Sequence, residues 1–436
     1  METATGLADS FSAESIGIVP SRSVLPREKL ISFVNHFFDR GEIYRDVVNT
    51  YGSPLYVLES SVLRARAEQF RTAFESELPR VSCYFAVKSN NHPDVARILT
   101  ETGFGLDVSS GLELNMALSQ GNTDIIFSGP GKTLPELELA VENAEKVIVL
   151  LDSFSELSRI GDIARSRGKT IRAGVRLNFN PTGLWRKFGI KANELSQFLE
   201  ASQAWPNVSL QGIQFHSSWN LTPATQIKTI QELGQLLRTM PETFTEKIEF
   251  IDIGGGFWPE VGEWLQPVET REGTERETEG KKIELNSSPS CFPADSIKTF
   301  AQLLGKTIRE QIFPTRTCRI CCEPGRWICN DAMQLLITAL DKKAPDLVVT
   351  DAGTNAIGWE RFETDYIPIL NLTRPELSEH PCYILGSLCT PHDVWGYAYW
   401  GSGIQTGDLL LVPTQGAYTF SLRQNFIKPI PPVVTI

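Results

Sequence analysis

The sequence predicts an α/β fold in which a (β/α)8 barrel is followed by a mostly β domain. Short apolar strands, polar turns and stretches with helical periodicity alternate along the first three quarters of the chain. Eight strands alternating with helices over about 250 residues have the size and rhythm of such a barrel. After Asn330 the sequence becomes strand-rich, which indicates a second domain. A doubly wound open sheet stays the alternative, since periodicity does not count strands.

The expected barrel elements follow one another without a long gap. We expect strands at 81–87, 104–109, 124–129, 146–152, 171–178, 210–216, 248–254 and 317–325. We expect helices at 91–101, 110–120, 133–144, 153–168, 222–240 and 297–312. The domains then run as follows: an N-terminal extension with a strand that joins the β domain (1–58), the barrel (59–330) and the C-terminal β domain (331–436). A charged segment at 266–290 is too poor in apolar residues to pack, so we expect an insertion there.

Composition excludes several classes of protein. A formal net charge of -11 leaves no basic excess for nucleic acid. No segment is apolar enough to cross a membrane, and the first residues lack the pattern of a secretion signal, so we expect a cytoplasmic protein. The eight cysteines are then reduced thiols. Three of them, in "CRICC", lack a second ligand pair, so we expect no metal site.

Polar residues gather at the carboxyl ends of the expected strands, where barrels carry their active sites. They are Lys88, Asp107, Arg176, His216, the glycines 254–256 and Glu323. Each alone could equally be a buried polar residue or a turn glycine, but together they define one rim. The glycine run offers backbone N–H groups to an anion. A strand-end lysine on the same rim suits pyridoxal 5'-phosphate (PLP), whose aldehyde bonds to an amine.

Eight ordered motifs carry a family resemblance. They are "YFAVKSNNHPDVARIL", "GFGLDVSSGLELNMAL", "KFGI", "DIGGGF", "CEPGRW", "TDAG", "LCTPHD" and "GAYTF". In order and spacing the chain resembles the fold-type III PLP-dependent decarboxylases of diaminopimelate, ornithine and arginine, from about Tyr51 to Ala417. The diaminopimelate branch is the most similar. The resemblance implies decarboxylation of an amino acid, a carboxy-lyase activity.

The resemblance also implies roles for single residues. Lys88 becomes the Schiff-base lysine, and His216 lies against one face of the pyridine ring. The phosphate is expected to contact Gly254, Gly255, Gly256 and Tyr418, with Arg326 nearby, and Gly325 is a further expected cofactor-binding residue. Asp107 and Arg176 match family positions close to the cofactor.

Glu323 of "CEPGR" decides the expected reaction. A carboxylate beside the pyridine nitrogen keeps that nitrogen protonated and the ring an effective electron sink, which favours decarboxylation. Alanine racemases, which have a similar barrel, place an arginine there. In the family, a cysteine matching Cys389 donates a proton from the neighbouring subunit, together with an aspartate matching Asp393. The resemblance therefore implies a homodimer with shared active sites.

Three departures from the family pattern bear on the substrate. Trp219 stands where the family has a phosphate-binding serine, and Ser217 or Ser218 could compensate. Thr390 replaces a glutamate that meets the distal amino group of diaminopimelate. The segment "TDAGTNAIGWERFETDYIP" lacks the usual Arg-Pro pair and tyrosine-histidine ending; the residues near those places are Glu360, Arg361, Glu363 and Tyr366.

We therefore expect a substrate other than diaminopimelate, which Thr390, Asp393, Glu360, Arg361 and Tyr366 would contact. A distal carboxylate, a carrier-protein thioester or another side chain could take its place, as in a specialised biosynthetic pathway. Two further hypotheses stay open at this stage: a PLP-dependent racemase or other lyase, and an inactive cofactor-binding regulator. The retained Lys88, Glu323 and Cys389 argue against the regulator.

Overall fold

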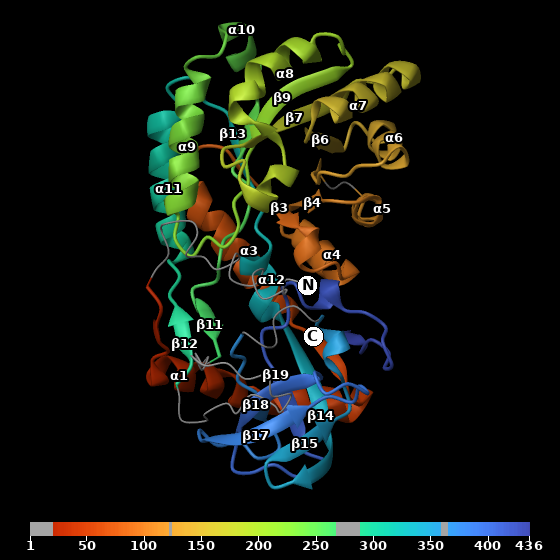
Figure 1. The fold of residues 1–436 in the computed structure, drawn as a ribbon, viewed down its shortest axis with the longest axis vertical. Coiled ribbons are helices and arrows are strands. Elements are labelled where there is room, and N and C mark those ends of the chain that lie inside the picture. The colour runs from red at the N-terminus through yellow and green to blue at the C-terminus, as the bar shows by residue number, and fades with distance from the viewer. Residues whose placement is uncertain (1–20, 122–123, 267–287, 359–364) are drawn as a thin grey trace, which may run out of the picture. The chain divides into compact units, whose positions relative to one another are not determined.

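The computed structural model describes residues 21–121, 124–266, 288–358 and 365–436. The chain divides into two compact units, a barrel unit and a β unit. Within the described residues, the barrel unit comprises 63–260 and 294–329 (Figure 1). The β unit comprises 21–62, 261–293 and 330–436, apart from the two gaps in the description.

Eight parallel strands close the barrel. Their order is β6-β5-β4-β3-β13-β10-β9-β7, and β7 pairs with β6 to complete the ring. The strands are β3 (Val81–Ala86), β4 (Gly105–Val108), β5 (Ile125–Phe127), β6 (Val147–Leu151), β7 (Ile171–Asn178), β9 (Val208–Gln214), β10 (Phe250–Asp252) and β13 (Arg319–Cys322), with the short β8 (Ile190–Lys191) beside β7. Every residue of β4, β5 and β6 is buried, as expected for parallel strands covered on both faces. All eight expected barrel strands are confirmed.

One aromatic ring shapes part of the barrel interior. Phe250 belongs to a buried cluster with Tyr84, Ile148 and Cys321. A Cβ at Gly212 would lie 2.1 Å from the Phe250 ring, and one at Gly174 would lie 2.9 Å from it. Glycine on the two neighbouring strands β7 and β9 therefore makes the room that the ring occupies.

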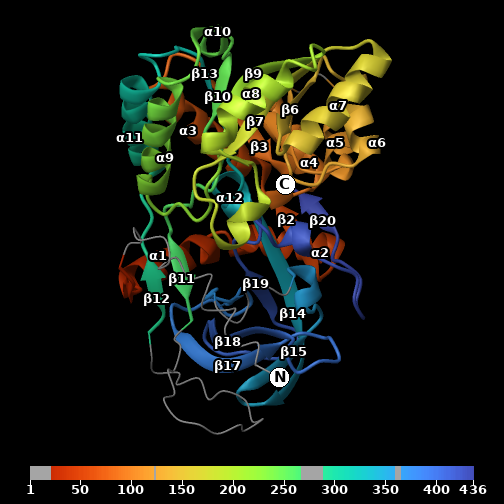
Figure 2. The ribbon, with the colours of Figure 1, turned by 45° about the horizontal axis from the view of Figure 1, so that its top comes forward.

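Helices precede, connect and follow the strands of the barrel. They are α3 (Ser60–Glu75), α4 (Pro93–Glu101), α5 (Gly111–Ser119), α6 (Leu134–Glu142), α7 (Phe154–Arg167), α8 (Leu195–Ser202), α9 (Ala224–Leu237), α10 (Glu242–Thr245), α11 (Ile297–Gln311) and α12 (Arg326–Cys329). Serine side chains cap three of them, through Ser110 at α5, Ser153 at α7 and Ser296 at α11. Helices α9 and α11 pack side by side (Figure 2).

The β unit is built on one large mixed sheet. Its order is β15-β17-β18-β16-β19-β14-β2-β20, with a further pairing of β15 to β14. These strands are β2 (Leu55–Leu58), β14 (Met333–Ala344), β15 (Leu347–Thr350), β16 (Leu370–Asn371), β17 (Glu379–Leu385), β18 (Val394–Trp400), β19 (Leu409–Val412) and β20 (Val433–Thr435). A smaller sheet is formed by β1 (Ser23–Val24), β12 (Ser290–Phe292) and β11 (Glu263–Leu265). The predicted barrel with a mostly β second domain is confirmed.

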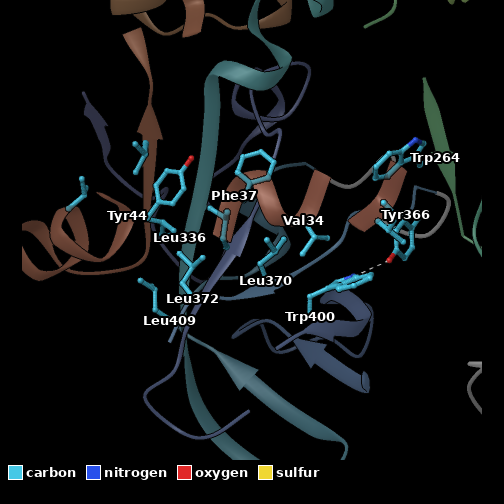
Figure 3. Packing of buried hydrophobic residues seen from close by; sticks show 14 of the residues in the cluster. Val34, Phe37, Tyr44, Trp264, Leu336, Tyr366, Leu370, Leu372, Trp400 and Leu409 are labelled. Carbon is cyan, nitrogen blue, oxygen red and sulfur yellow. Dashed lines mark hydrogen bonds between the residues drawn. The ribbon is translucent and has the colours of Figure 1, made fainter. Parts of the chain in front are cut away.

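Two helices of the β unit, α1 (Arg27–Phe38) and α2 (Gly41–Tyr51), were not expected from the sequence. Each buries one stripe of apolar residues, with Val34 on α1 and Tyr44 on α2 in the core cluster of this unit (Figure 3). In the same cluster the Trp400 indole N–H donates to the Tyr366 hydroxyl at 3.4 Å (Figure 3). The extension before the barrel therefore supplies a packed layer as well as a strand.

Some sequence expectations lie outside the described residues. Most of the charged insertion, from 267 to 287, is among them. All eight cysteines are described as free thiols, and those of "CRICC" are buried on or next to β13. Within the described ranges, no helix combines the length and the apolar character needed to cross a bilayer.

Candidate active site

Lys88 lies directly after strand β3, in the 3₁₀ turn Val87–Ser89. Its ammonium nitrogen is 3.1 Å from Asp107 Oδ2, and 36% of its side chain is exposed. Asp107 is on the neighbouring strand β4, where it pairs with Ala86 in the sheet. The strand end thus holds the lysine at its base and leaves the amine accessible.

Asp107 is a fully buried carboxyl group with two different partners. Its Oδ2 faces Lys88, and its Oδ1 accepts a hydrogen bond of 2.6 Å from the Ser128 hydroxyl. Burial raises the pKa of Asp107 and the charge of Glu323 raises it further, although Lys88 and Ser128 oppose the change. Asp107 therefore orients the amine of Lys88. Its own pKa is raised, so it loses its proton less readily than an exposed aspartic acid.

Glu323 follows the last barrel strand, β13, and its side chain is 1% exposed. Burial alone would raise the pKa of Glu323, but His216, the charge of Lys88 and Asp252 lower it below its usual value. Gln214 Nε2 donates to both oxygens of its carboxylate, and these hydrogen bonds are long, at 3.4 and 3.5 Å. Glu323 is thus a buried carboxyl group whose neighbours favour its negatively charged form.

Asp252, at the end of β10, stands beside Glu323. Its Oδ1 accepts a hydrogen bond of 2.8 Å from the Gly254 N–H. Burial raises the pKa of Asp252 well above its ordinary value, and the negative charge of Glu323 adds to the shift. Of this pair, Asp252 is therefore the carboxyl group that holds a proton more firmly.

His216 follows β9 and closes the same end of the barrel. Its Nδ1 accepts a hydrogen bond of 3.2 Å from the Gly255 N–H, so the ring nitrogen on this side carries no proton. Nδ1 is also 3.7 Å from Glu323 Oε2, which is too long for a hydrogen bond. Burial lowers the pKa of His216, in keeping with a neutral ring.

The glycine loop 254–256 packs against two strand ends so closely that only glycine fits. A Cβ at Gly254, Gly255 or Gly256 would come within 2.2–2.6 Å of a backbone oxygen. Gly254 and Gly256 also have positive φ angles of 68° and 79°. The Gly256 N–H donates to no group in the described part of the chain, which leaves it for a ligand. A further close approach occurs at Gly325, where a Cβ would meet the Ser89 side chain at 2.9 Å.

The two predicted arginines stand on aromatic rings. The Arg176 guanidinium lies 4.6 Å from the centre of the Phe188 ring and 3.8 Å from Asp152. The Arg326 guanidinium lies 4.5 Å from the centre of the Trp258 ring. Such stacking fixes the plane of a guanidinium.

Trp219, which stands where the family has a phosphate-binding serine, has an unusual backbone conformation. Trp219 has a φ of 55° and is 50% exposed, and its ring is 6.0 Å from that of Trp258. A positive φ is rare for so large a residue and marks local strain. The Ser217 hydroxyl donates to Asn220 Oδ1 at 3.2 Å. Whether Ser217 or Ser218 meets a phosphate stays a prediction.

Cys389, which belongs to the β unit, is the one exposed cysteine among the eight of the chain. The loop that carries it is held by Asp393, which is 2% exposed. Asp393 accepts hydrogen bonds from the Leu388 N–H at 2.6 Å and from the Thr354 N–H at 2.7 Å. The Thr390 carbonyl accepts in turn from the Asp393 N–H at 3.4 Å. Asp393 therefore positions the cysteine loop.

The other predicted residues of the β unit have varied surroundings. Tyr366 is 8% exposed, and its hydroxyl donates to Glu379 Oε1 at 2.7 Å. This hydrogen bond gives Tyr366 a structural role. Its contact with the substrate stays a prediction. Tyr418 is half-buried with a φ of 58°. Glu360, Arg361 and Glu363 lie outside the described residues.

The structure brings the predicted barrel residues Lys88, Asp107, His216, Gly254–Gly256 and Glu323 into one connected cluster. Sequence reasoning missed Gln214, Asp252 and Ser128. Asp252 and Gln214 are direct neighbours in the pairing of β10 with β9, so the periodic strand pattern could have suggested them once the register was known.

The cluster fits a pyridine ring that carries an aldehyde and a phosphate. Lys88 offers an accessible amine for the aldehyde, and Glu323 offers a buried charged acceptor for a protonated ring nitrogen. The glycine loop offers backbone N–H groups where no side chain can stand. The residues present are therefore those that PLP requires.

Comparisons with known proteins agree with this chemistry. Residues 62–330 match the family model described as "Pyridoxal-dependent decarboxylase, pyridoxal binding domain". A diaminopimelate decarboxylase from Aquifex aeolicus is 28% identical over 408 residues, which cover 89% of this chain and 87% of that protein. The L-glutamyl-[BtrI acyl-carrier protein] decarboxylase of Niallia circulans is 27% identical, with 88% of each chain covered.

Solved structures share the fold. Diaminopimelate decarboxylase from M. jannaschii superimposes with a TM-score of 0.74 at 23% identity, over 89% of this chain and 88% of that one. A lysine/ornithine decarboxylase from Vibrio vulnificus gives a TM-score of 0.71 at 21% identity, over 91% and 98%.

A barrel of this kind, with an accessible lysine and a buried carboxylate at its carboxyl end, defines a PLP-binding protein. Because the family model covers more than half of the chain, the chain belongs to the pyridoxal-dependent decarboxylases. It is a PLP-dependent amino-acid decarboxylase, and the predicted family, cofactor and reaction class are confirmed.

Proposed function

We propose that this decarboxylase holds PLP through Lys88, Glu323 and His216 and acts on an amino acid other than diaminopimelate. The observation that carries the assignment is the buried Glu323 carboxylate, held in its charged form beside an accessible lysine. When bound, PLP supplies the electron sink for the carbon that loses carbon dioxide. The remaining tasks fall to residues of the chain.

Lys88 would hold the cofactor through its aldehyde. Asp107 directs the amine of Lys88 through a contact of 3.1 Å. Glu323 would offer a buried acceptor that favours a protonated pyridine nitrogen. His216, whose pKa is lowered by burial, would add a neutral ring to the wall of the site.

The phosphate is held by neutral and charged donors. The Gly256 N–H and the edge of the Arg326 guanidinium provide two of them, with Gly254, Gly255 and Gly325 allowing the close approach. Ser218 and Tyr418 add hydroxyl groups. Arg176 lies near the cofactor and contributes positive charge.

The chain acts as a homodimer with shared active sites. Cys389 of one subunit donates a proton at the site of the other, and Asp393 holds the loop that presents it. The free thiols suit the reducing cytoplasm.

The subunit arrangement has a direct test. Lys88→Ala and Cys389→Ala proteins are each inactive in this proposal, but a mixture with exchanged subunits should regain up to about a quarter of wild-type activity. Half of the dimers are then hybrids with one intact site of two. No recovery, with subunit exchange shown by differently tagged chains, contradicts shared sites.

The substrate lacks a second α-amino-acid centre. Thr390 cannot provide the charge that a glutamate gives to a distal ammonium group. A second candidate is an amino acid linked to a carrier protein, because one relative of similar coverage acts on such a substrate. Carbon dioxide release from L-, D- and meso-amino acids tests the choice. We expect meso-diaminopimelate to have a kcat/KM at least about 100-fold below that of the preferred amino acid. A clear optimum for diaminopimelate contradicts the proposal.

A further inference from the structure

A cavity of about 90 Å³ lies at the carboxyl ends of β7 and β9 in the barrel unit. Four aromatic rings line it: Phe179, Trp185, Phe188 and Phe215. Neutral hydroxyl and amide groups make up most of the remaining wall, including Thr225 and Thr229 of α9. The cavity is therefore mainly aromatic, with neutral polar groups.

The aromatic wall is held in place by its own chain. The Asn178 side-chain amide donates to the carbonyl oxygens of Trp185 and Phe188, both at 2.8 Å. Phe179 meets Phe215 edge to face, with ring centres 6.3 Å apart. Gly189, with a φ of 67°, lets the end of this loop return to within contact of the Arg176 carbonyl. The loop is thus a built structure that presents Trp185 and Phe188 to the cavity.

The charges of the wall exclude a distal ammonium group. Among the described residues that line the cavity there is no carboxylate. The fixed charge is the guanidinium of Arg176, which lies over the Phe188 ring. A substrate ammonium in the cavity would meet this cation and lose water without gaining an acceptor of opposite charge, which is unfavourable.

Arg176 and His216 also line the cavity, so it adjoins the residues assigned above to the cofactor. A side chain that leaves the reacting carbon can enter it from there. Its volume is smaller than the roughly 150 Å³ of a cavity that accepts benzene. Short aliphatic, thioether or amide groups match this size.

We propose that this aromatic cavity receives the side chain of the substrate and selects a short one without a positive charge. The inference rests on the proposed function, because it takes the neighbouring cluster as the cofactor site. Trp185 is the specificity-determining residue. It lines the cavity from the loop after β7, and it does not belong to the cluster around Lys88 and Glu323 that is assigned to the cofactor.

The test compares Trp185→Ala with Leu184→Ala. Leu184 lies on the same 3₁₀ turn, Gly183–Lys187, but is 69% exposed and does not line the cavity. The measured quantity is kcat/KM for leucine, methionine and glutamine against lysine and ornithine. Wild type should prefer the amino acids whose side chains carry no positive charge. Trp185→Ala should lower that preference by about tenfold or more, and Leu184→Ala should leave it unchanged.

Binding provides a second readout that does not depend on turnover. Isothermal titration of the cofactor-loaded enzyme with isopentylamine and with cadaverine should give tighter binding of the uncharged-tail amine, and Trp185→Ala should abolish the difference. Tighter binding of cadaverine, or equal losses for both amines, overturns the selection of a side chain without a positive charge. Failure to bind PLP at all would instead overturn the proposed function, and the cofactor absorbance reveals that case.

Discussion

Two lysines of the barrel unit, Lys88 and Lys132, follow the strands β3 and β5, and each contacts a carboxyl group, yet their exposure differs. Lys132 is 1% exposed, as is its partner Glu156, and the two are 2.8 Å apart. Its ammonium also donates to the carbonyls of Gly129 and Leu150. Three acceptors match the three N–H groups of an ammonium, so every N–H group of Lys132 has a hydrogen-bond partner.

Lys88, in contrast to Lys132, has a side chain that solvent can reach. Its amine is partly exposed, and its closest carboxyl, Asp107, divides its two oxygens between the lysine and Ser128. A second carboxylate, Glu323, acts on it through charge. The difference teaches that the exposure of the side chain, 36% for Lys88 against 1% for Lys132, rather than the presence of an ion pair, separates a lysine that a cofactor can reach from a structural one.

The largest expected effect follows from Lys88→Met. The amine that binds the cofactor is lost, so turnover should fall by at least about 1000-fold. The visible absorbance of enzyme-bound cofactor should disappear with it. A variant that keeps both absorbance and turnover would show that another amine holds PLP.

Lys132→Met should act on stability instead. It leaves Glu156 buried without its partner, which costs about 3–5 kcal/mol in the free energy of unfolding. Urea unfolding measures the loss, and kcat at a temperature where the variant is folded should stay near that of wild type.

A matched double variant separates charge from shape. Lys132→Met with Glu156→Leu removes both charges, so most of the lost stability should return. If the double variant is as unstable as Lys132→Met alone, the loss of stability comes from lost packing. That result would contradict the view that the buried charge of Glu156 causes the loss.

Glu323→Gln should lower kcat by about 100-fold to 1000-fold, because a neutral amide cannot hold the proton on the pyridine nitrogen. KM should change far less. Glu156→Gln provides the control in the closed cluster and should leave kcat unchanged where the protein is folded. A Glu323→Gln variant within about threefold of wild type would contradict the role of the carboxylate.

The smallest expected effect is a pH dependence. Asp252 has a raised pKa when folded, so the folded state keeps a proton that the unfolded state releases above about pH 4. Stability due to this group therefore falls as the pH rises from the unfolded pKa towards the folded one. Asp252→Asn removes this fall and keeps an acceptor for the Gly254 N–H. Urea unfolding of the cofactor-free variant should show a weaker loss of stability between about pH 4 and pH 7 than wild type. An unchanged pH profile would mean that Asp252 is ionised.

The sequence was sufficient for the barrel because each strand is a short apolar run that ends in a polar turn, as at Lys88 and His216. It could not distinguish Lys88 from Lys132 by burial, and here the family motif made the choice. Helices α1 and α2 were missed because their apolar stripes are short and lie in a region that we expected to be an extension with a strand.

The partners of Glu323 depended on strand register. Asp252 pairs with Gln214 on one side and with Cys321 on the other. These registers bring both polar side chains to the carboxylate, which comes two residues after Cys321. The order of the strands can be read from the sequence, but the alignment of neighbours in a closed barrel cannot, so neither contact could be predicted from it.

The central claim is that the partly exposed Lys88, and not the buried Lys132, holds the cofactor. One measurement tests it directly. Borohydride reduction fixes PLP covalently to the amine that binds it, and peptide mass spectrometry then locates the added mass. The account predicts the label on the peptide that contains Lys88, at close to one cofactor for each chain, and none on Lys132. Label on Lys132 or on another lysine, with Lys88 unmodified, would contradict it.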